Sequence, residues 1–312
     1  MSLMRLRPEY VTILLFLIAL AISSALSPYF ADVVFILESA TYSIELGLIA
    51  LTLTLVVISG EIDLSVAAIL ALAACIFGEV FDAGAGVWPA TLAALASGLV
   101  MGLANGLLVT RLGLPSLIVT IGTMTLYRGI AQVLVGDKSI GGFPGWFVGI
   151  DFRTLGMVPV PVALFFAVAL VLAFVLAGTV FGRQIYLIGT NLSAARFAGV
   201  RVERVKLILF ALSGLTAAAG GVLMASRLGV VRYDMATAGE LRAVLIVMLG
   251  GTYIFGGRGS IFGTVVALWL LIVIQTGMTV ANIKIESQLT VLGLLLILAI
   301  IGTNAIYART GR

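Results

Sequence analysis

The 312-residue chain contains no histidine and a single cysteine. Without histidine it lacks the commonest general base and the commonest imidazole metal ligand, so histidine-based catalysis is excluded. One thiol, Cys75, cannot form a disulfide within the chain, and its apolar neighbours predict a small buried hydrophobe. No G-x-x-x-x-G-K-[ST] phosphate loop occurs either. We therefore expect no enzyme, no metal site and no cofactor in this chain, and any ATPase to be a separate subunit.

Charge is also scarce. Charged residues make up 10% of the chain and hydrophobic residues 62%, with a mean hydropathy of +1.23, whereas soluble domains contain roughly a quarter charged residues. A bilayer core takes roughly 20 apolar residues per helical crossing, so the sequence predicts one all-α polytopic membrane bundle of about ten spans over residues 1–312. The spans are expected near residues 9–27, 39–58, 63–81, 88–110, 114–135, 158–178, 205–227, 240–255, 259–281 and 287–303.

Positive charge is unevenly distributed between the loops. If the N-terminus is cytoplasmic, eleven Lys and Arg lie on the cytoplasmic side and five on the other, which satisfies the positive-inside rule. This bias predicts an even number of spans with both termini cytoplasmic. The apolar run 11–26 after Arg5 and Arg7 also fits a signal peptide, but a retained first span is favoured because no soluble domain follows. The eleven are residues 5, 7, 111, 183, 196, 201, 204, 206, 258, 309 and 312.

Glycine is abundant, with 36 residues. Small residues let membrane helices pack closely. The similar fragments I-V-T-I-G (118–122) and I-V-M-L-G (246–250) lie in spans expected to run in opposite directions, which hints at inverted-repeat pseudo-symmetry. The glycines at close helical spacing are Gly98, Gly102, Gly106, Gly214, Gly220 and Gly221.

The longest connection expected in the cytoplasm covers residues 182–206. Asn191 or Ser193 can cap a short helix there, and Gly199 supplies a left-handed stop. Such a helix would lie along the membrane surface, able to dock on another subunit, although an ordinary basic loop that only fixes topology fits the same composition. Its apolar side would consist of Leu192, Ala195 and Phe197.

The pattern G-R-x-x-Y-x-I-G-x-N-x-x-A-A-R-x-x-G-V-x-V-x-R-V-K over 182–206 resembles the coupling segment of ribose/xylose/rhamnose/autoinducer-type permeases of ABC importers, within the branched-chain amino acid/monosaccharide permease superfamily. S-G-E-I-D-L-S (59–65), P-S-L-I-V-T-I-G-T-M (115–124) and L-G-G-T-Y-I-F-G-G-R-G-S (249–260) resemble the same family. Together with hydropathy, these stretches cover nearly the whole chain. The residues that the resemblance assigns to ATPase coupling are Gly182, Arg183, Gly189, Asn191, Ala194, Ala195, Arg196 and Gly199.

The resemblance implies a set of partners. Two permease subunits would surround a central path, two ATP-binding subunits holding ATP and Mg²⁺ would dock on the coupling helices, and an extracytoplasmic sugar-binding protein would deliver substrate. The assembly would sit in the lipid of the bacterial plasma (inner) membrane, with no nucleic-acid partner. The expected function is import of a monosaccharide or sugar-like solute of the rhamnose, ribose or autoinducer class. Which sugar is carried stays open, because selectivity is expected to lie largely in the binding protein.

The sequence departs from the family pattern at two positions. Glu61 stands where the family usually has Gly, and Arg242 stands where it often has an acid. Glu61 and the stretch 140–144 are most similar to the rhamnose and autoinducer systems, which pair two different permeases. A homodimer and a heterodimer both stay open.

A path for a hydroxylated solute needs polar side chains inside the spans and few fixed charges. Arg128 is costly in lipid, and snorkelling toward the outer interface is the favoured interpretation of it. Glu45 should face protein or water, with Arg128 as a candidate partner. The candidates for the path are Asn105, Thr120, Thr123, Arg128 and Gln275, with Thr125 beside them.

Two turns are candidates for a gate. Asp63 is predicted to cap a helix that begins at Leu64, with gating as the alternative. G-G-R-G-S (256–260) lacks the lysine of a phosphate loop and predicts a tight turn. Short or broken helices are expected near these turns, and the first span is expected at the periphery. The gate or turn residues are Gly60, Glu61, Asp63, Gly256 and Gly257.

Three other functions compete with ABC import of a sugar. An ion-coupled secondary transporter of a small polar solute would bind Na⁺ or H⁺ through acids near the midplane, where Glu45 is the only support. An intramembrane enzyme would need a nucleophile with a base or a metal cluster. Within importers, the nearest rival is a branched-chain amino acid permease; the coupling motif and S-G-x-I-D-L-S favour sugars.

Overall fold

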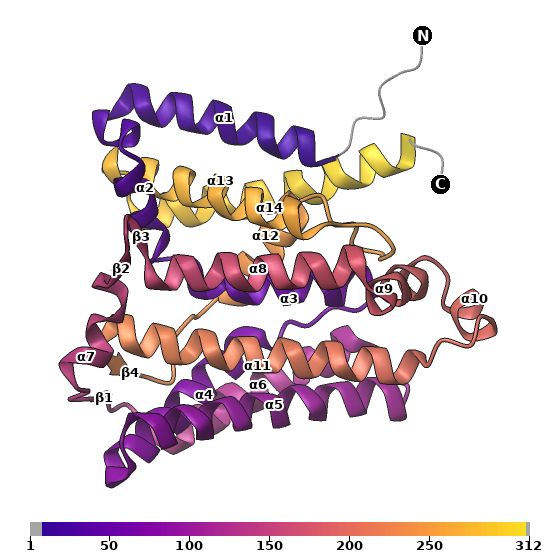
Figure 1. The fold of residues 1–312 in the computed structure, drawn as a ribbon, viewed down its shortest axis with the longest axis horizontal. Helices are drawn as coiled ribbons and strands as arrows, with labels where there is room; N and C mark the ends of the chain where they lie inside the picture. Colours follow the sequence, from indigo (N-terminus) through magenta and orange to yellow (C-terminus); the bar gives the residue numbers. More distant parts are fainter. Residues whose placement is uncertain (1–7, 310–312) are drawn as a thin grey trace.

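A computed structural model describes residues 8–309 as a bundle of helices that run along one long axis (Figure 1). We call the two ends of the bundle the α10 end and the α7 end, after the short helices found there (Figure 1). The first half comprises α1 (Pro8–Leu26), η1 (Pro28–Ala31), α2 (Val33–Ala40), α3 (Ile44–Ile58), α4 (Val66–Val80), η2 (Phe81–Ala85), α5 (Val87–Arg111), α6 (Ser116–Val135), β1 (Ile140–Gly141), α7 (Gly145–Val148) and η3 (Gly149–Phe152).

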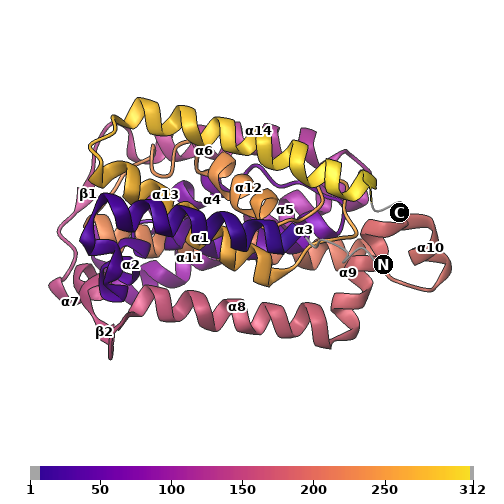
Figure 2. The same cartoon turned by 90° about the horizontal axis from the view of Figure 1, so that it is seen from above.

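The second half has the same helical character. Figure 2 shows α14 along one side of the bundle and α8 along the other, with α1 between them. Its elements are β2 (Thr154–Leu155), β3 (Val158–Pro159), α8 (Val160–Gly178), α9 (Val180–Thr190), α10 (Leu192–Phe197), α11 (Val202–Leu228), β4 (Val230–Val231), α12 (Gly239–Leu249), α13 (Ile261–Val280) and α14 (Ile285–Arg309).

The predicted polytopic helical bundle is confirmed. Within residues 8–309, 8 helices are long and apolar enough to cross a membrane, or up to 9 if α2 and α3, bent by 72° at their junction, form one span. The span predicted at 240–255 is instead the 11-residue helix α12 followed by an irregular segment to Ser260. The turns near Gly60 and Gly256 are therefore the places where helices are short or interrupted, as predicted.

The two ends of the described chain lie on the same side. α1 begins and α14 ends at the α10 end (Figures 1 and 2), the arrangement that an even number of spans requires. α6 begins beside residues 59–65, where the backbone N–H of Ile62 donates to Ser116 Oγ over 3.1 Å. α12 ends at that same end, so the two spans with similar fragments run in opposite directions. Arg5, Arg7 and Arg312, used in the charge argument, lie outside the described residues.

Burial separates central from peripheral helices. Every residue of α3 is buried, whereas only 11% of the span in α1 and 17% of that in α14 is buried. α1 and α14 thus present apolar side chains outward, as expected of helices that face lipid. The peripheral position predicted for the first span is confirmed.

α5 and α11 pack with their backbones in close contact. A Cβ built on Gly102 would lie 2.3 Å from Phe210 O, and one on Gly214 would lie 2.2 Å from Gly98 O. Only a residue without a side chain fits at such an approach. The glycine spacing read from the sequence therefore marks a real helix–helix contact.

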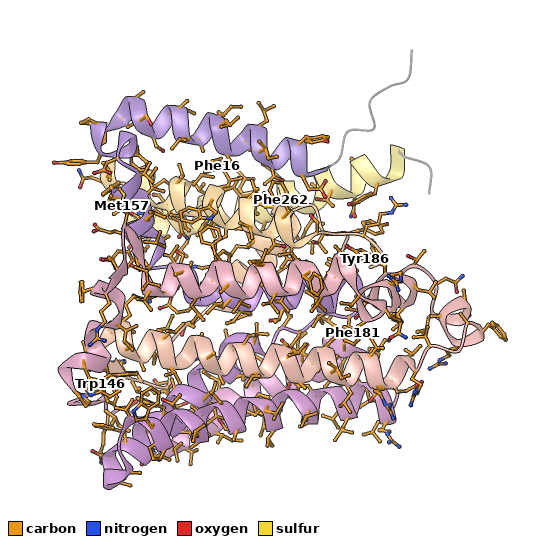
Figure 3. The ribbon with its side chains drawn as sticks, in the orientation of Figure 1. Phe16, Trp146, Met157, Phe181, Tyr186 and Phe262 are labelled. Carbon is orange, nitrogen blue, oxygen red and sulfur yellow. The ribbon has the colours of Figure 1, made fainter. Side chains whose placement is uncertain are left out.

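The segment between α6 and α8 caps the α7 end. Phe143 and Phe147 are buried against Phe77, with ring centroids 5.3 and 5.1 Å from it. Trp146 stacks on Trp88 at 5.8 Å and lies at the α7 end in Figure 3. Two-residue strands pair β1 with β4 and β2 with β3. The two phenylalanines are thus core residues rather than lipid-interface residues.

Candidate functional site

The coupling segment forms a short helix that stands clear of the bundle (Figures 1 and 2). Asn191 caps α10, since its Oδ1 accepts from Ala194 N over 2.9 Å. Gly199, at φ 79°, ends the turn in the left-handed region. Phe197, on this short helix, is 93% exposed. The predicted helix, cap and stop are all present.

The residues assigned to coupling divide into two groups. Ala195 is fully buried against its own chain, whereas Leu192 and Phe197, predicted to share an apolar side with it, are exposed. The helix α10 itself contacts α9 and α11. Gly182 is also buried, because a Cβ there would lie 2.1 Å from Leu176 O. The exposed members are Arg183, Asn191, Ala194, Arg196 and Gly199.

Three segments meet through glycine backbones beneath α10. A Cβ on Gly189 would lie 1.8 Å from Ile58 O, and Gly257 N donates to that same oxygen over 2.7 Å. Gly256, at φ 87°, lies against Gly60, at φ 84°. We call Gly60, Gly189, Gly256 and Gly257 the glycine junction. It joins α9 directly to the two turns predicted to be a gate.

The glycine junction is braced by a tyrosine. Tyr186 of α9 donates from its hydroxyl to Gly259 O over 2.7 Å, and Figure 3 shows it near Phe181 at the α10 end. Burial raises the pKa of the Tyr186 phenol. The hydroxyl therefore stays protonated and available as a donor.

Asp63 is the centre of a buried polar network. Its Oδ1 accepts from Ser65 N (3.0 Å) and Ser65 Oγ (2.6 Å), and its Oδ2 accepts from Ser213 Oγ (2.9 Å). Asn105 Nδ2 donates to Ser65 Oγ over 2.8 Å, and Tyr127 donates to Asn105 Oδ1 over 3.1 Å. The network ties α4, α5, α6 and α11 together. The helix begins at Val66, two residues later than predicted, because Asp63 closes a turn ahead of it.

Glu61 forms an ion pair with Lys206 of α11, and both side chains are largely buried. The pair borders a cavity of about 320 Å³ that Leu192 and Arg196 of α10 also line. Arg196 itself pairs with Glu203 at 2.9 Å on the surface. The unusual Glu61 thus links the 59–65 turn to the base of the coupling helix.

The predicted path residues do not gather in one place. Asn105 belongs to the Asp63 network, Thr120 donates to Ile62 O over 3.3 Å, and Thr123 donates to Thr120 O over 3.4 Å. All three are buried within the packing of the chain. Thr125 instead lines a shallow groove of about 600 Å³ on the outer face of α6 with Gly122 and Gly129.

Arg128 does not pair with Glu45. Its Nη1 donates to the carbonyls of Tyr233 and Met235 over 2.8 and 2.7 Å, so backbone oxygens of the loop after β4 satisfy the charge. Glu45 is buried and accepts from Arg227 Nε over 2.7 Å. The predicted Glu45–Arg128 contact is wrong because Arg227, on α11, lies nearer to α3.

Gln275 lies apart from the other path candidates. It lines a cavity of about 520 Å³ at the α7 end, together with Arg242. In the sequence, Arg242 stands out only as a departure from the family pattern, and hydropathy gives no sign that Arg242 and Gln275 share a cavity.

Comparisons with known proteins agree with one another. The family described as "Branched-chain amino acid transport system / permease component" matches residues 35–300. A protein of Klebsiella pneumoniae named "Autoinducer 2 import system permease protein LsrD" is 33% identical over 307 residues, 96% of this chain and 92% of its own length. Proteins of the same name from Yersinia enterocolitica and Escherichia coli are each 34% identical, over 88% and 93% of this chain and 84% and 90% of their own lengths. No solved structure matches.

Proposed function

The chain belongs to the permease family of branched-chain amino acid transport systems, and on that basis we propose that it is the membrane-spanning permease of an ATP-driven importer for a sugar-like solute. In this assignment it is a transport subunit rather than an enzyme. Two ATP-binding subunits, which bind ATP and Mg²⁺, supply the energy. A second permease completes the pore, and an extracytoplasmic binding protein delivers the solute.

One observation carries the proposal: α10 is an exposed helix anchored on both sides by packed segments. Phe197 offers a large apolar side chain to a partner, and exposed aromatic residues are typical anchors of protein–protein contacts. The buried Ala195 and the Asn191 cap hold the helix rigid. A force applied to α10 would therefore move α9 and α11 rather than unfold the loop.

The glycine junction gives that movement a route into the membrane. α9 contacts the end of α3 at Ile58 and the 256–259 turn through backbone atoms. Because such contacts are closely packed, a displacement of one segment moves the other. Lys206 and Glu61 make a second link from α11 to the 59–65 turn. In the proposal, ATP binding and hydrolysis at the partner subunits shift these two turns and so open or close the path.

The α10 end is assigned to the cytoplasm, with both termini on that side. Arg183, Arg196 and Lys206 lie at this end, as the positive-inside rule requires. The solute class rests on the relatives, which are named as autoinducer 2 import permeases. The proposal covers the class of solute and a second permease subunit; it specifies neither one sugar nor a homodimer or heterodimer.

Two measurements test the proposal. The tagged chain is purified from its native membrane in mild detergent, and mass spectrometry identifies what remains bound; an ATP-binding subunit is expected. The purified assembly is then placed in liposomes, and uptake of autoinducer 2, ribose, rhamnose and leucine is compared with and without ATP. Uptake that depends on an ion gradient and not on ATP would overturn the importer and support an ion-coupled secondary transporter. ATP-driven uptake of leucine alone would support an amino-acid permease in place of a permease for a sugar-like solute.

A further inference from the structure

A cavity of about 520 Å³ lies at the α7 end, away from the coupling helix. Its walls come from the α2–α3 junction, the start of α12, the end of α13 and the start of α14. Pockets of about 300–1,000 Å³ are the usual size for small ligands. The cavity takes no part in the contacts that link α10 to the two turns.

One wall of the cavity carries hydrogen-bond donors without acceptors. Arg242 Nε is buried and has no hydrogen-bond partner among the described residues, and the structure gives its guanidinium no ion pair within residues 8–309. Gln275 accepts from Ser43 Oγ through Oε1 over 3.4 Å, and its Nε2 donates to none of the described residues. Burying a charged donor atom without an acceptor is costly, so the Nε of this partly buried guanidinium indicates a missing acceptor.

The rest of the lining sets the character of that ligand. No acidic side chain lines the cavity, so Arg242 is its only charged group among the described residues. The apolar part of the wall includes Phe35, Leu289 and Leu292. A guanidinium beside an amide favours a compact group with several acceptor oxygens, and its planar fork matches a phosphate.

We infer that this cavity binds a phosphate group, carried by a phospholipid headgroup or by a soluble phosphate ester, with Arg242 as its principal ligand and Gln275 as a second donor. The phosphate oxygens accept from Arg242 Nε and from Gln275 Nε2. The apolar wall accommodates the carbon chain next to the phosphate. Since the site lies at the α7 end, it is independent of ATPase docking.

Native mass spectrometry of the full-length chain in its purified complex tests this inference. Dioleoyl phosphatidylglycerol is titrated against dioleoylglycerol, which lacks the phosphate, and glycerol 3-phosphate is titrated against glycerol. Arg242→Gln is expected to weaken binding of the phosphate-bearing probe by about tenfold or more, because hydrogen bonds to charged groups are strong. Gln275→Leu should weaken it less. Arg232→Gln, which removes an exposed arginine at the same end, is the matched control and should leave binding unchanged.

The lipid titration and the glycerol 3-phosphate titration together identify the source of the phosphate. Arg242-dependent binding of phosphatidylglycerol indicates a lipid site, and Arg242-dependent binding of glycerol 3-phosphate indicates a soluble ester; either supports the inference. Dioleoylglycerol that binds as tightly as phosphatidylglycerol, equal binding by Arg242→Gln and the unchanged chain, or failure of both phosphate probes to bind would overturn it. If Arg242→Gln elutes as an aggregate, Arg242→Lys, which lacks the planar fork, and Gln275→Leu carry the test. Each should weaken binding of the phosphate-bearing probe, and unchanged binding in both would overturn the inference.

Discussion

Gly189 of α9 lies so close to Ile58, the last residue of α3, that a Cβ at position 189 would be 1.8 Å from the Ile58 carbonyl oxygen. That oxygen already accepts a hydrogen bond from Gly257 N at 2.7 Å. A single backbone oxygen therefore joins α3, α9 and the 256–259 turn. The coupling segment therefore contacts both turns at Gly189 through backbone atoms, without any side chain between them.

Gly189→Ala is expected to separate these segments. The methyl group needs a shift of backbone atoms, and overpacking of this kind costs about 1–3 kcal/mol or more. Thermal unfolding of the purified chain in detergent should show a lower midpoint, and ATP-dependent uptake by the assembly should fall. Gly302→Ala, at a position of α14 where a Cβ would meet no atom within 4 Å, is the matched control and should lower neither measurement. Normal stability and uptake in Gly189→Ala would show that the junction is not tight.

Substitutions of Phe197 and Ala195 should distinguish an effect on docking of the partner from an effect on folding of the chain. Phe197→Ala removes an exposed side chain, so the chain alone should unfold normally while recovery of the ATP-binding subunit in a pull-down drops severalfold. Ala195→Glu puts a charge into a buried position and should lower the unfolding midpoint of the chain itself. If Phe197→Ala leaves recovery of the partner unchanged, the docking role of α10 fails.

The sequence predicted the spans because hydropathy and length report directly on solvation by lipid. It predicted α10 because a cap and a left-handed glycine are local signals, as Asn191 and Gly199 show. Burial of Ala195 was not predictable, since it depends on how α10 sits on α9 and α11. A motif alone does not distinguish a residue that docks a partner from one that packs inside.

Asp63→Ala should destabilise the chain more than Asp63→Asn. Alanine leaves three donors from Ser65 and Ser213 without an acceptor, at about 1–3 kcal/mol for each buried group left unpaired. Asparagine keeps one oxygen for Ser65 and can donate to Ser213 Oγ. Unfolding midpoints of the two variants in the same detergent make the comparison. Equal midpoints would mean that the hydrogen bonds of Asp63 do not hold α4 and α11 together.

The Glu61–Lys206 pair should show a measurable coupling energy. Because both side chains are largely buried, a double-mutant cycle with Glu61→Gln and Lys206→Gln should give about 1–2 kcal/mol, between the values for exposed and buried pairs. The matched control is the exposed pair of Arg196 and Glu203, which should give less than about 1 kcal/mol. A coupling energy no larger than that of the control would show that the Glu61–Lys206 pair does not link α11 to the 59–65 turn.

Charge partners show the limit of prediction from a single sequence. Glu45 pairs with Arg227, 182 positions along the chain, although Arg128 is nearer in sequence and also lies in a span. Hydropathy places both arginines in helices but carries no information on which faces meet. The unpaired Nε of Arg242 could not be predicted either, because a cavity arises only when four segments are assembled.

Because α5 and α11 are in backbone contact, two Gly→Ala substitutions should shift the unfolding midpoint of the chain in opposite directions. Glycine in a helix is normally about 0.5–1 kcal/mol less stable than alanine, so Gly293→Ala, at a site on α14 with no neighbouring atom within 4 Å, should raise the unfolding midpoint slightly. Gly102→Ala should lower it, because its methyl group would meet Phe210 O at 2.3 Å and push the two helices apart. Both variants are measured by thermal unfolding of the isolated chain in one detergent, so partner subunits do not contribute. Since helix propensity acts equally on the two, the difference between them reports the packing alone, and a rise in both midpoints would show that α5 and α11 are not in backbone contact.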